Sequence, residues 1–209
     1  MKTIPYCERD LTDWHRGIAH YGFWAVLVDD QGWLELFETA RLHVERFIHP
    51  GYKRAPHITV AACGLLSEEH FSTTFQRRQK DALIKAKVPP FFLRAGMLDS
   101  FASAPYITVE DLDGSLDELR SILATISTED NPAVYKPHIT LGLYRGAFET
   151  SMVGNHFREF RSISTSKLSV TELAFCIYET SEIQGPFIVA ERVALADSGR
   201  VEGVAGSAP

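Results

Sequence analysis

The tetrapeptide Pro-His-Ile-Thr occurs twice in this sequence and carries residue types suited to proton transfer and anion binding. The first copy contains His57 and Thr59, and the second contains His138 and Thr140. Because the side chains of a strand alternate between its two faces, each histidine shares a face with the threonine two residues later. The proline before each histidine favours an extended backbone and fits the first position of a strand. Both histidines are therefore expected at the start of a strand, near the rim of a sheet.

Two histidines that approach one small space from opposite sides could transfer protons at a phosphorus centre. An unperturbed imidazole titrates at about pH 6.5, so one can accept a proton while the other donates one. The two threonine hydroxyls can donate hydrogen bonds to the oxygens of an anion. These groups predict in-line displacement, in which one histidine deprotonates water and the other protonates the leaving oxygen. The sequence leaves open which histidine is the base and which ester bond breaks.

The positions that follow each motif are small, which would leave room for a ligand. If strand alternation continues, Ala61 and Cys63 share the face of the first histidine. By the same rule, Gly142 and Tyr144 share the face of the second histidine.

The elements that would position the motifs form two similar units. The expected elements are a strand at 20–30, a helix over 33–47, the first motif strand, a polar helix from Ser67 to about Ala86, strands at 91–101 and 105–112, a helix that Ser115 caps, the second motif strand, a short helix near 150–160, and strands at 168–180 and 186–195. The order strand, helix, motif strand, helix thus occurs twice. Two such units that share a sheet-lined cleft would bring the motifs face to face.

Composition limits the class of protein and of partner. The 209 residues suffice for one sizeable domain or two lobes that share a core. The net charge of −6 argues against binding long nucleic acid through its backbone. No apolar run of membrane-spanning length and no secretory signal pattern is present, so we expect no membrane partner and a cytoplasmic location. We expect a monomer that acts on a small anionic molecule.

The sequence contains no recognisable metal or phosphate-loop motif. Neither H-E-x-x-H nor a glycine-rich phosphate loop occurs. The three cysteines, Cys7, Cys63 and Cys176, are far apart and match no metal spacing. We therefore predict no metal and no cofactor.

The paired H-x-T motifs, His57-Ile58-Thr59 and His138-Ile139-Thr140, resemble the signature of the two-histidine (2H) phosphoesterase superfamily. The pattern is most similar to the plant-type cyclic phosphodiesterases. The resemblance extends over roughly residues 20–195 and includes the segments YGFWAVLVDD, PHITVAACGLLS, PHITLGLY and LAFCIYET. It implies an α+β fold with two lobes related by a pseudo-twofold axis, two mostly antiparallel sheets lining a central cleft, and helices on the outside. We expect a single bilobal domain over 1–197 and a flexible tail over 198–209.

The resemblance also implies metal-independent hydrolysis of a cyclic phosphate on ribose. The substrate would be ADP-ribose 1″,2″-cyclic phosphate or a nucleoside 2′,3′-cyclic phosphate. The catalytic histidines of the family correspond to His57 and His138, and its phosphate-binding hydroxyls correspond to Thr59 and Thr140. A family tyrosine corresponds to Tyr144 if Gly142 is counted as an insertion. A substrate-contacting aromatic corresponds to Trp24. For the tyrosine and the tryptophan, packing in the core is the alternative.

Two other functions remain open at this point. The same site could act on RNA ends or on 2′–5′-linked oligonucleotides. Alternatively, the chain could be a non-catalytic nucleotide-binding module. The intact pair of titratable motifs counts against the latter, because a binding module does not need two proton-transfer groups.

Overall fold

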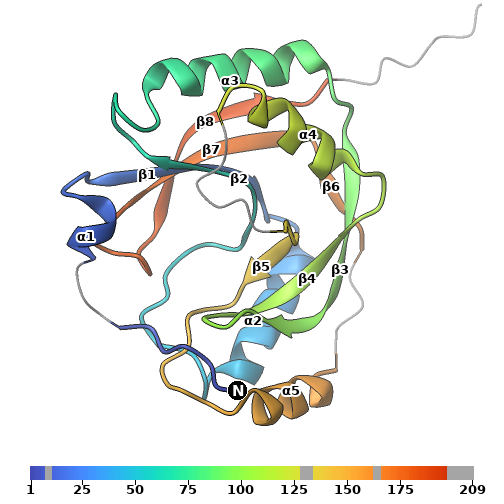
Figure 1. The fold of residues 1–209 in the computed structure, drawn as a ribbon. Coiled ribbons are helices and arrows are strands. Elements are labelled where there is room, and N and C mark those ends of the chain that lie inside the picture. Colours follow the sequence, from blue (N-terminus) through green and yellow to red (C-terminus); the bar gives the residue numbers. More distant parts are fainter. Residues whose placement is uncertain (8–10, 128–133, 162–165, 197–209) are drawn as a thin grey trace, which may run out of the picture.

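The computed structural model describes residues 1–7, 11–127, 134–161 and 166–196. Its strands form two four-stranded sheets (Figure 1). The strands are β1 (His20–Leu27), β2 (His57–Leu65), β3 (Phe91–Ser100), β4 (Pro105–Asp111), β5 (His138–Thr140), β6 (Leu168–Val170), β7 (Glu172–Glu179) and β8 (Phe187–Ala194). The helices are α1 (Thr12–His15), α2 (Gln31–Val44), α3 (Thr73–Ala86), α4 (Ser115–Ala124) and α5 (Thr150–Glu159). The tail predicted over 198–209 lies outside the described residues.

The two sheets are built alike. Their strand orders are β2-β1-β7-β8 and β5-β4-β3-β6, and each recorded strand pair is antiparallel. The motif strands β2 and β5 are therefore equivalent edge strands. Their approach to the sheet is also equivalent, because Val28 N donates to Pro56 O at 3.2 Å and Val109 N donates to Pro137 O at 3.0 Å. This arrangement confirms the predicted α+β class, the duplicated architecture and the antiparallel sheets.

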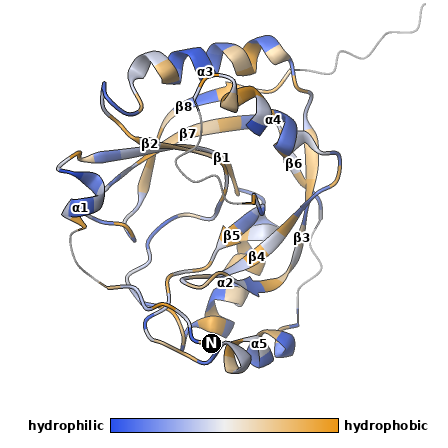
Figure 2. Ribbon diagram, viewed as in Figure 1, coloured by the Kyte–Doolittle hydropathy of each residue, from blue (hydrophilic) through white to orange (hydrophobic). Residues whose placement is uncertain are grey.

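Two of the helices pack against the sheet of the other half. Helix α2 follows β1 of the first sheet but contacts β4 of the second, whereas α4 follows β4 but contacts β2. Helices α3 and α5 contact β8 and β3, respectively. In Figure 2, α3 and α5 alternate between hydrophilic and hydrophobic stretches, as expected for helices with one buried face. Residues from both sheets consequently belong to one continuous hydrophobic core.

Two elements differ from the sequence predictions. Helix α3 begins at Thr73 and not at Ser67, because the Ser67 hydroxyl accepts a hydrogen bond from His70 N in a preceding turn. The run predicted as one strand at 168–180 divides at Thr171. Its first part, β6, joins the second sheet, and its second part, β7, joins the first sheet. One apolar run therefore contributes to both halves of the molecule.

Helix α4 begins where the sequence predicts, but with a different cap. Its N-cap residue is Gly114, in the left-handed region with φ 76°, and Ser115 is the first helical residue. The carboxylate of Asp111 accepts a hydrogen bond from Leu116 N at 2.8 Å. An acidic side chain from the end of β4 therefore supplies the capping contact that we expected from a serine.

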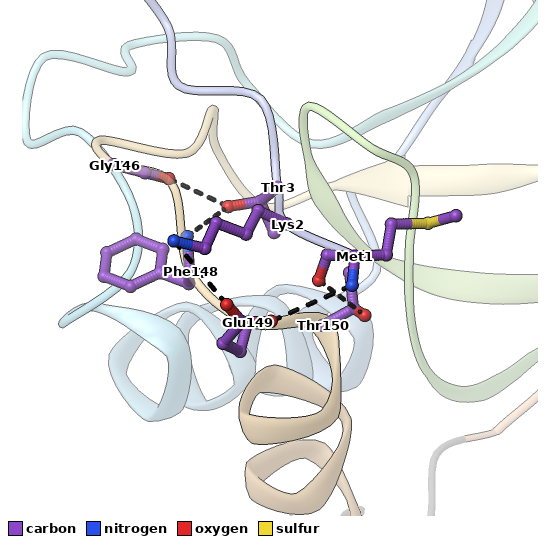
Figure 3. A network of polar contacts seen from close by, with 7 residues as sticks. All are labelled: Met1, Lys2, Thr3, Gly146, Phe148, Glu149 and Thr150. Atoms are coloured by element: carbon purple, nitrogen blue, oxygen red, sulfur yellow. Dashed lines mark hydrogen bonds and ion pairs between the residues drawn. The ribbon is translucent and has the colours of Figure 1, made fainter.

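The first residues of the chain form hydrogen bonds with the segment that follows β5 (Figure 3). The buried Thr3 hydroxyl donates to Gly146 O at 2.8 Å and accepts from Phe148 N at 2.9 Å. Lys2 forms an ion pair with Glu149 at 3.6 Å, but both side chains are mostly exposed, so this pair contributes little. The buried threonine therefore provides most of the specificity of this attachment.

Candidate active site

His57 is the first residue of β2 and lies opposite Leu27, at the end of β1. Its ring packs between two aromatic side chains, with centroid distances of 5.3 Å to Phe23 and 5.0 Å to Phe187. Only 8% of the residue is exposed. Its Nδ1 atom lies 2.8 Å from the carbonyl oxygen of Ala55.

His138 occupies the equivalent position at the start of β5, opposite Thr108. Its ring also contacts two aromatic side chains, with centroid distances of 4.8 Å to Phe101 and 5.2 Å to Tyr106. Its Nδ1 atom lies 2.6 Å from the carbonyl oxygen of Lys136. Unlike His57, this histidine is partly exposed.

Both imidazoles are oriented by the same backbone contact. A carbonyl oxygen can only accept a hydrogen bond, so Nδ1 must carry the proton in each ring. In the neutral ring, Nε2 is then unprotonated and can accept a proton; in the charged ring, Nε2 can donate one. Each motif therefore presents one defined nitrogen for proton transfer.

The two motifs lie close enough to influence each other. Strands β2 and β5 are in contact. Burial lowers the pKa of His57 to about 4, and the positive charges of Arg54 and His138 act in the same direction, against the hydrogen bond to Ala55. Burial also lowers the pKa of His138, against the hydrogen bond to Lys136. The structure thus brings together the two histidines that the sequence places in separate units.

Each threonine lies on the same face of its strand as the histidine of the same motif. Thr59 lies opposite Ala25 in the β1–β2 pair, and Thr140 lies opposite Tyr106 in the β4–β5 pair. Both threonines are partly exposed. Each threonine lies two positions along the strand from its histidine, so both hydroxyls lie on the side of the sheet that bears the imidazoles. We call this side of the first sheet its inner face.

Beyond Thr59, the first motif strand departs from simple alternation. Ala25 lies opposite Thr59 but Trp24 lies opposite Ala61, so Val60 is the extra residue of a β-bulge. A bulge shifts the following residues to the opposite face. Ala61 consequently belongs to the hydrophobic core, and so does Cys63. The prediction that these two small residues line the inner face is therefore wrong.

Trp24 faces away from the site. It is fully buried, and its indole Nε1 donates to Gln79 Oε1 of α3 at 2.9 Å. The neighbouring Phe23 points to the inner face and contacts His57. The predicted substrate contact of Trp24 is therefore wrong, and Phe23 is the aromatic residue of β1 that reaches the site. Strand parity with His57 is the signal that distinguishes the two.

Tyr144 is also a core residue. Strand β5 ends at Thr140, so the alternation that would carry Tyr144 to the face of the histidine stops before it. The tyrosine instead pairs with Ile48, is fully buried, and has its hydroxyl 2.6 Å from Ser100 Oγ. The predicted substrate contact of Tyr144 is therefore not supported by its position, and the alternative of packing in the core is correct.

The basic residues before the motifs have different surroundings. Lys53 is exposed and pairs with Glu182 at 3.1 Å, and Lys136 is exposed. Arg54, by contrast, folds over the ring of Tyr178, with its guanidinium carbon 3.9 Å from the ring centroid. The sequence position of Arg54 does not indicate this contact with Tyr178, because most basic residues before a strand are solvated.

Within the described part of the chain, no group of three or more histidine, cysteine or acidic side chains is arranged to hold a metal ion. No helix in the same ranges is long and apolar enough to cross a membrane.

Comparison with known proteins gives a family and a fold. The family model of the 2′-5′ RNA ligase superfamily matches residues 28–182. E. coli LigT, solved in complex with phosphate, has a similar fold, with a TM-score of 0.56 and 16% identity over 87% of this chain and 100% of that chain. The protein TT0787 of Thermus thermophilus is similar at a TM-score of 0.56 and 17% identity, over 85% of this chain and 99% of that chain. No curated protein matches the sequence significantly.

The family match spans most of the chain and includes both H-x-T motifs. These motifs occupy equivalent edge strands of a duplicated fold. The chain therefore belongs to the 2′-5′ RNA ligase superfamily of 2H phosphoesterases, and this membership supports a phosphodiesterase-type activity.

Proposed function

We propose that this protein is a metal-independent cyclic phosphodiesterase that opens a cyclic phosphate on ribose to a monophosphate. The proposed substrates are ADP-ribose 1″,2″-cyclic phosphate and nucleoside 2′,3′-cyclic phosphates. The observation that carries the proposal is the pair of imidazoles, His57 and His138, held by equivalent Nδ1 contacts and within electrostatic reach of each other. Such a pair supplies both proton transfers of the reaction.

The two histidines have unequal surroundings, which supports a division of roles. His57 is more deeply buried and lies beside the cation of Arg54, so it favours the neutral state that a general base requires. We assign it to deprotonation of the attacking water. His138 is more exposed, and we assign it to protonation of the leaving ribose oxygen. Thr59 and Thr140 donate hydrogen bonds to the non-bridging oxygens, where negative charge develops.

In this reaction the oxygen of water forms a new bond to phosphorus as one ester bond to ribose breaks. The proton of water passes to Nε2 of His57, and Nε2 of His138 gives its proton to the leaving oxygen. The product is a ribose monophosphate with a free neighbouring hydroxyl. Exchange of protons with water returns both rings to their starting states.

A turnover assay with purified protein and EDTA tests the proposal. The substrates are ADP-ribose 1″,2″-cyclic phosphate and the four nucleoside 2′,3′-cyclic phosphates. We expect His57→Ala and His138→Ala each to lower kcat by at least about 100-fold, as loss of a general acid or base does. His70→Ala, which removes an exposed histidine bonded to Ser67, is the matched control and should retain wild-type turnover. A melting-temperature comparison establishes that each variant is folded, and a folded His57 or His138 variant with more than about a tenth of wild-type activity contradicts the proposal.

A second candidate is cleavage of 2′–5′-linked oligonucleotides, and the name of the matching family favours its inclusion. E. coli LigT has been solved with 3′-AMP, with NADP+ and with ATP, so adenine compounds are suitable probes. A 2′–5′ adenylate trimer is therefore added to the same assay. Cleavage of the trimer without turnover of the cyclic phosphates selects this second candidate. Binding of the probes without any turnover selects a nucleotide-binding module.

A further inference from the structure

Arg54 is a cation on the inner face of the first sheet whose buried donors have no polar partner among the described residues. It lies three residues before His57, in the segment between α2 and β2. Its Nε and Nη2 atoms are buried and form no hydrogen bond with any described residue. Its recorded contact is the stacking of the guanidinium on Tyr178 of β7. The residue as a whole is only partly buried, so part of it remains open to a ligand.

A guanidinium with unsatisfied donors in this position requires a physical explanation. Buried donors without partners cost free energy, and native structures seldom leave them unsatisfied. Stacking on an aromatic ring compensates for part of the lost hydration but uses none of the five N–H donors. The planar fork of an arginine matches the oxygens of a phosphate. The arrangement is therefore the one expected of an arginine that binds an anionic ligand.

The surrounding contacts hold this segment of chain in place. The neighbouring residue Lys53 donates its backbone N–H to Gln184 O at 2.8 Å, and Arg41 Nη2 donates to Tyr52 O at 2.9 Å. The side-chain amide of Gln184 lies 2.9 Å from His49 Nδ1. The segment that carries Arg54 is thus anchored both to α2 and to the turn between β7 and β8, which preorganises the guanidinium for binding.

The guanidinium lies near enough to His57 for its charge to lower the pKa of that imidazole. Phe23 links the two places, because its ring centroid is 5.3 Å from that of His57 and 6.1 Å from that of Tyr178. The phosphate that reacts at His57 already has donors in the threonine hydroxyls. A ribose whose cyclic phosphate reacts at His57 carries its next substituent on the 5′ carbon of the same sugar.

We propose that Arg54 binds a second phosphate of the substrate, the one attached to the 5′ position of the ribose whose cyclic phosphate is opened. This inference rests on the proposed function and narrows its substrate class. The preferred substrates are ribose cyclic phosphates that also carry a 5′ phosphate. ADP-ribose 1″,2″-cyclic phosphate has such a group, and so has the last nucleotide of a short oligonucleotide with a cyclic phosphate end.

A matched pair of substrates isolates this contact. Adenosine 2′,3′-cyclic phosphate and its 5′-phosphorylated form differ only in the proposed ligand of Arg54. We expect wild-type kcat/KM to favour the 5′-phosphorylated form, mainly through a lower KM. In Arg54→Gln this preference should fall about tenfold, which corresponds to about 1.4 kcal/mol, close to the lower limit for a hydrogen bond to a charged group. Arg54→Lys keeps the charge but loses the fork and should show an intermediate preference.

Lys53→Gln is the matched control, because Lys53 is adjacent in sequence but exposed and paired with Glu182. It should keep the wild-type preference between the two substrates. The proposal is overturned if the wild type does not distinguish the two compounds. It is also overturned if Arg54→Gln slows both in equal proportion, because Arg54 would then act at the reacting phosphate or on the fold.

A binding measurement separates this proposal from the proposed function. If neither compound is turned over, the proposed function fails, and calorimetry with the same two compounds still tests Arg54. Tighter binding of the 5′-phosphorylated compound to the wild type, lost in Arg54→Gln, supports the second-phosphate contact; equal binding overturns it. The same measurement is then made with ADP-ribose 1″,2″-cyclic phosphate and with a dinucleotide that has a 2′,3′-cyclic end. The compound whose binding weakens more in Arg54→Gln is the better match for the substrate that supplies the second phosphate.

Discussion

At the scale of single residues, His57 and His138 share a backbone contact but not a microenvironment. Both rings donate Nδ1–H to the carbonyl two residues earlier. Their burial differs, since Phe23 and Phe187 cover His57 almost completely whereas His138 stays partly exposed. Burial disfavours the charged imidazole, so the more enclosed ring is more readily held in the neutral form that a general base requires. Side-chain packing thus breaks a symmetry that the backbone preserves.

The pH dependence of kcat/KM tests the paired acid–base roles. A general base must be neutral, so activity should rise with pH through the pKa of His57, at about 4. A general acid must be protonated, so activity should fall with pH through the pKa of His138, which burial places below its usual value of about 6.5. We expect a bell-shaped profile with its maximum on the acid side of neutrality. The reverse assignment needs the same total number of protons on the pair, so it gives a bell of the same shape and lower height; a profile without both limbs contradicts the paired roles.

At the scale of elements, the motif strand β2 depends on contacts from both of its sides. The bulge at Val60 directs the following residues into the core beneath α3, where Cys63 Sγ lies 3.5 Å from Gln79 Oε1. The same Gln79 accepts from Trp24 of β1 and donates its Nε2 to Leu123 O of α4 at 3.2 Å. One buried amide therefore links a strand next to the site with two covering helices.

Replacement of this amide should weaken the packing of the helices on the first sheet. Gln79→Leu leaves the indole N–H of Trp24 without a partner in the core, so we expect the free energy of unfolding to fall by about 1–3 kcal/mol. Urea denaturation measures this change. Gln76→Leu on the same helix is the control; its side chain bonds weakly to Glu191 at 3.4 Å, so a change within about 0.5 kcal/mol is expected. Equal effects of the two substitutions would argue against the buried link.

At the scale of the whole molecule, the two halves cover each other. Helix α2 leaves the first sheet to pack on the second, and α4 does the reverse. Each sheet therefore buries part of its apolar face against a helix that belongs to the other half. The chain should accordingly behave as the single bilobal domain that we predict for residues 1–197. The monomeric state, the cytoplasmic location and the lack of long nucleic-acid or membrane partners also stay predictions.

Thermal unfolding tests the single-domain prediction. We expect one transition, with the same midpoint by far-ultraviolet circular dichroism and by tryptophan fluorescence, because loss of either half exposes the core of the other. Trp24 and Trp33, both buried, report on the two halves. Two separate midpoints would mean that the lobes are independently stable domains.

The sequence by itself determined the four motif residues, their strand context and the duplicated order of elements. These features depend on local rules, because parity over two residues relates His57 to Thr59 and His138 to Thr140. The recurrence of one tetrapeptide in two similar contexts then indicated a shared site.

Only the tertiary structure decided which neighbours complete that site. The bulge in β2 and the early end of β5 turned Ala61 and Tyr144 into the core, because strand parity holds only while pairing stays regular. The position of Arg54 depends on Tyr178, more than 100 residues later in the chain. The lowered pKa values of the two histidines likewise follow from burial by distant strands, a property that no short stretch of sequence contains.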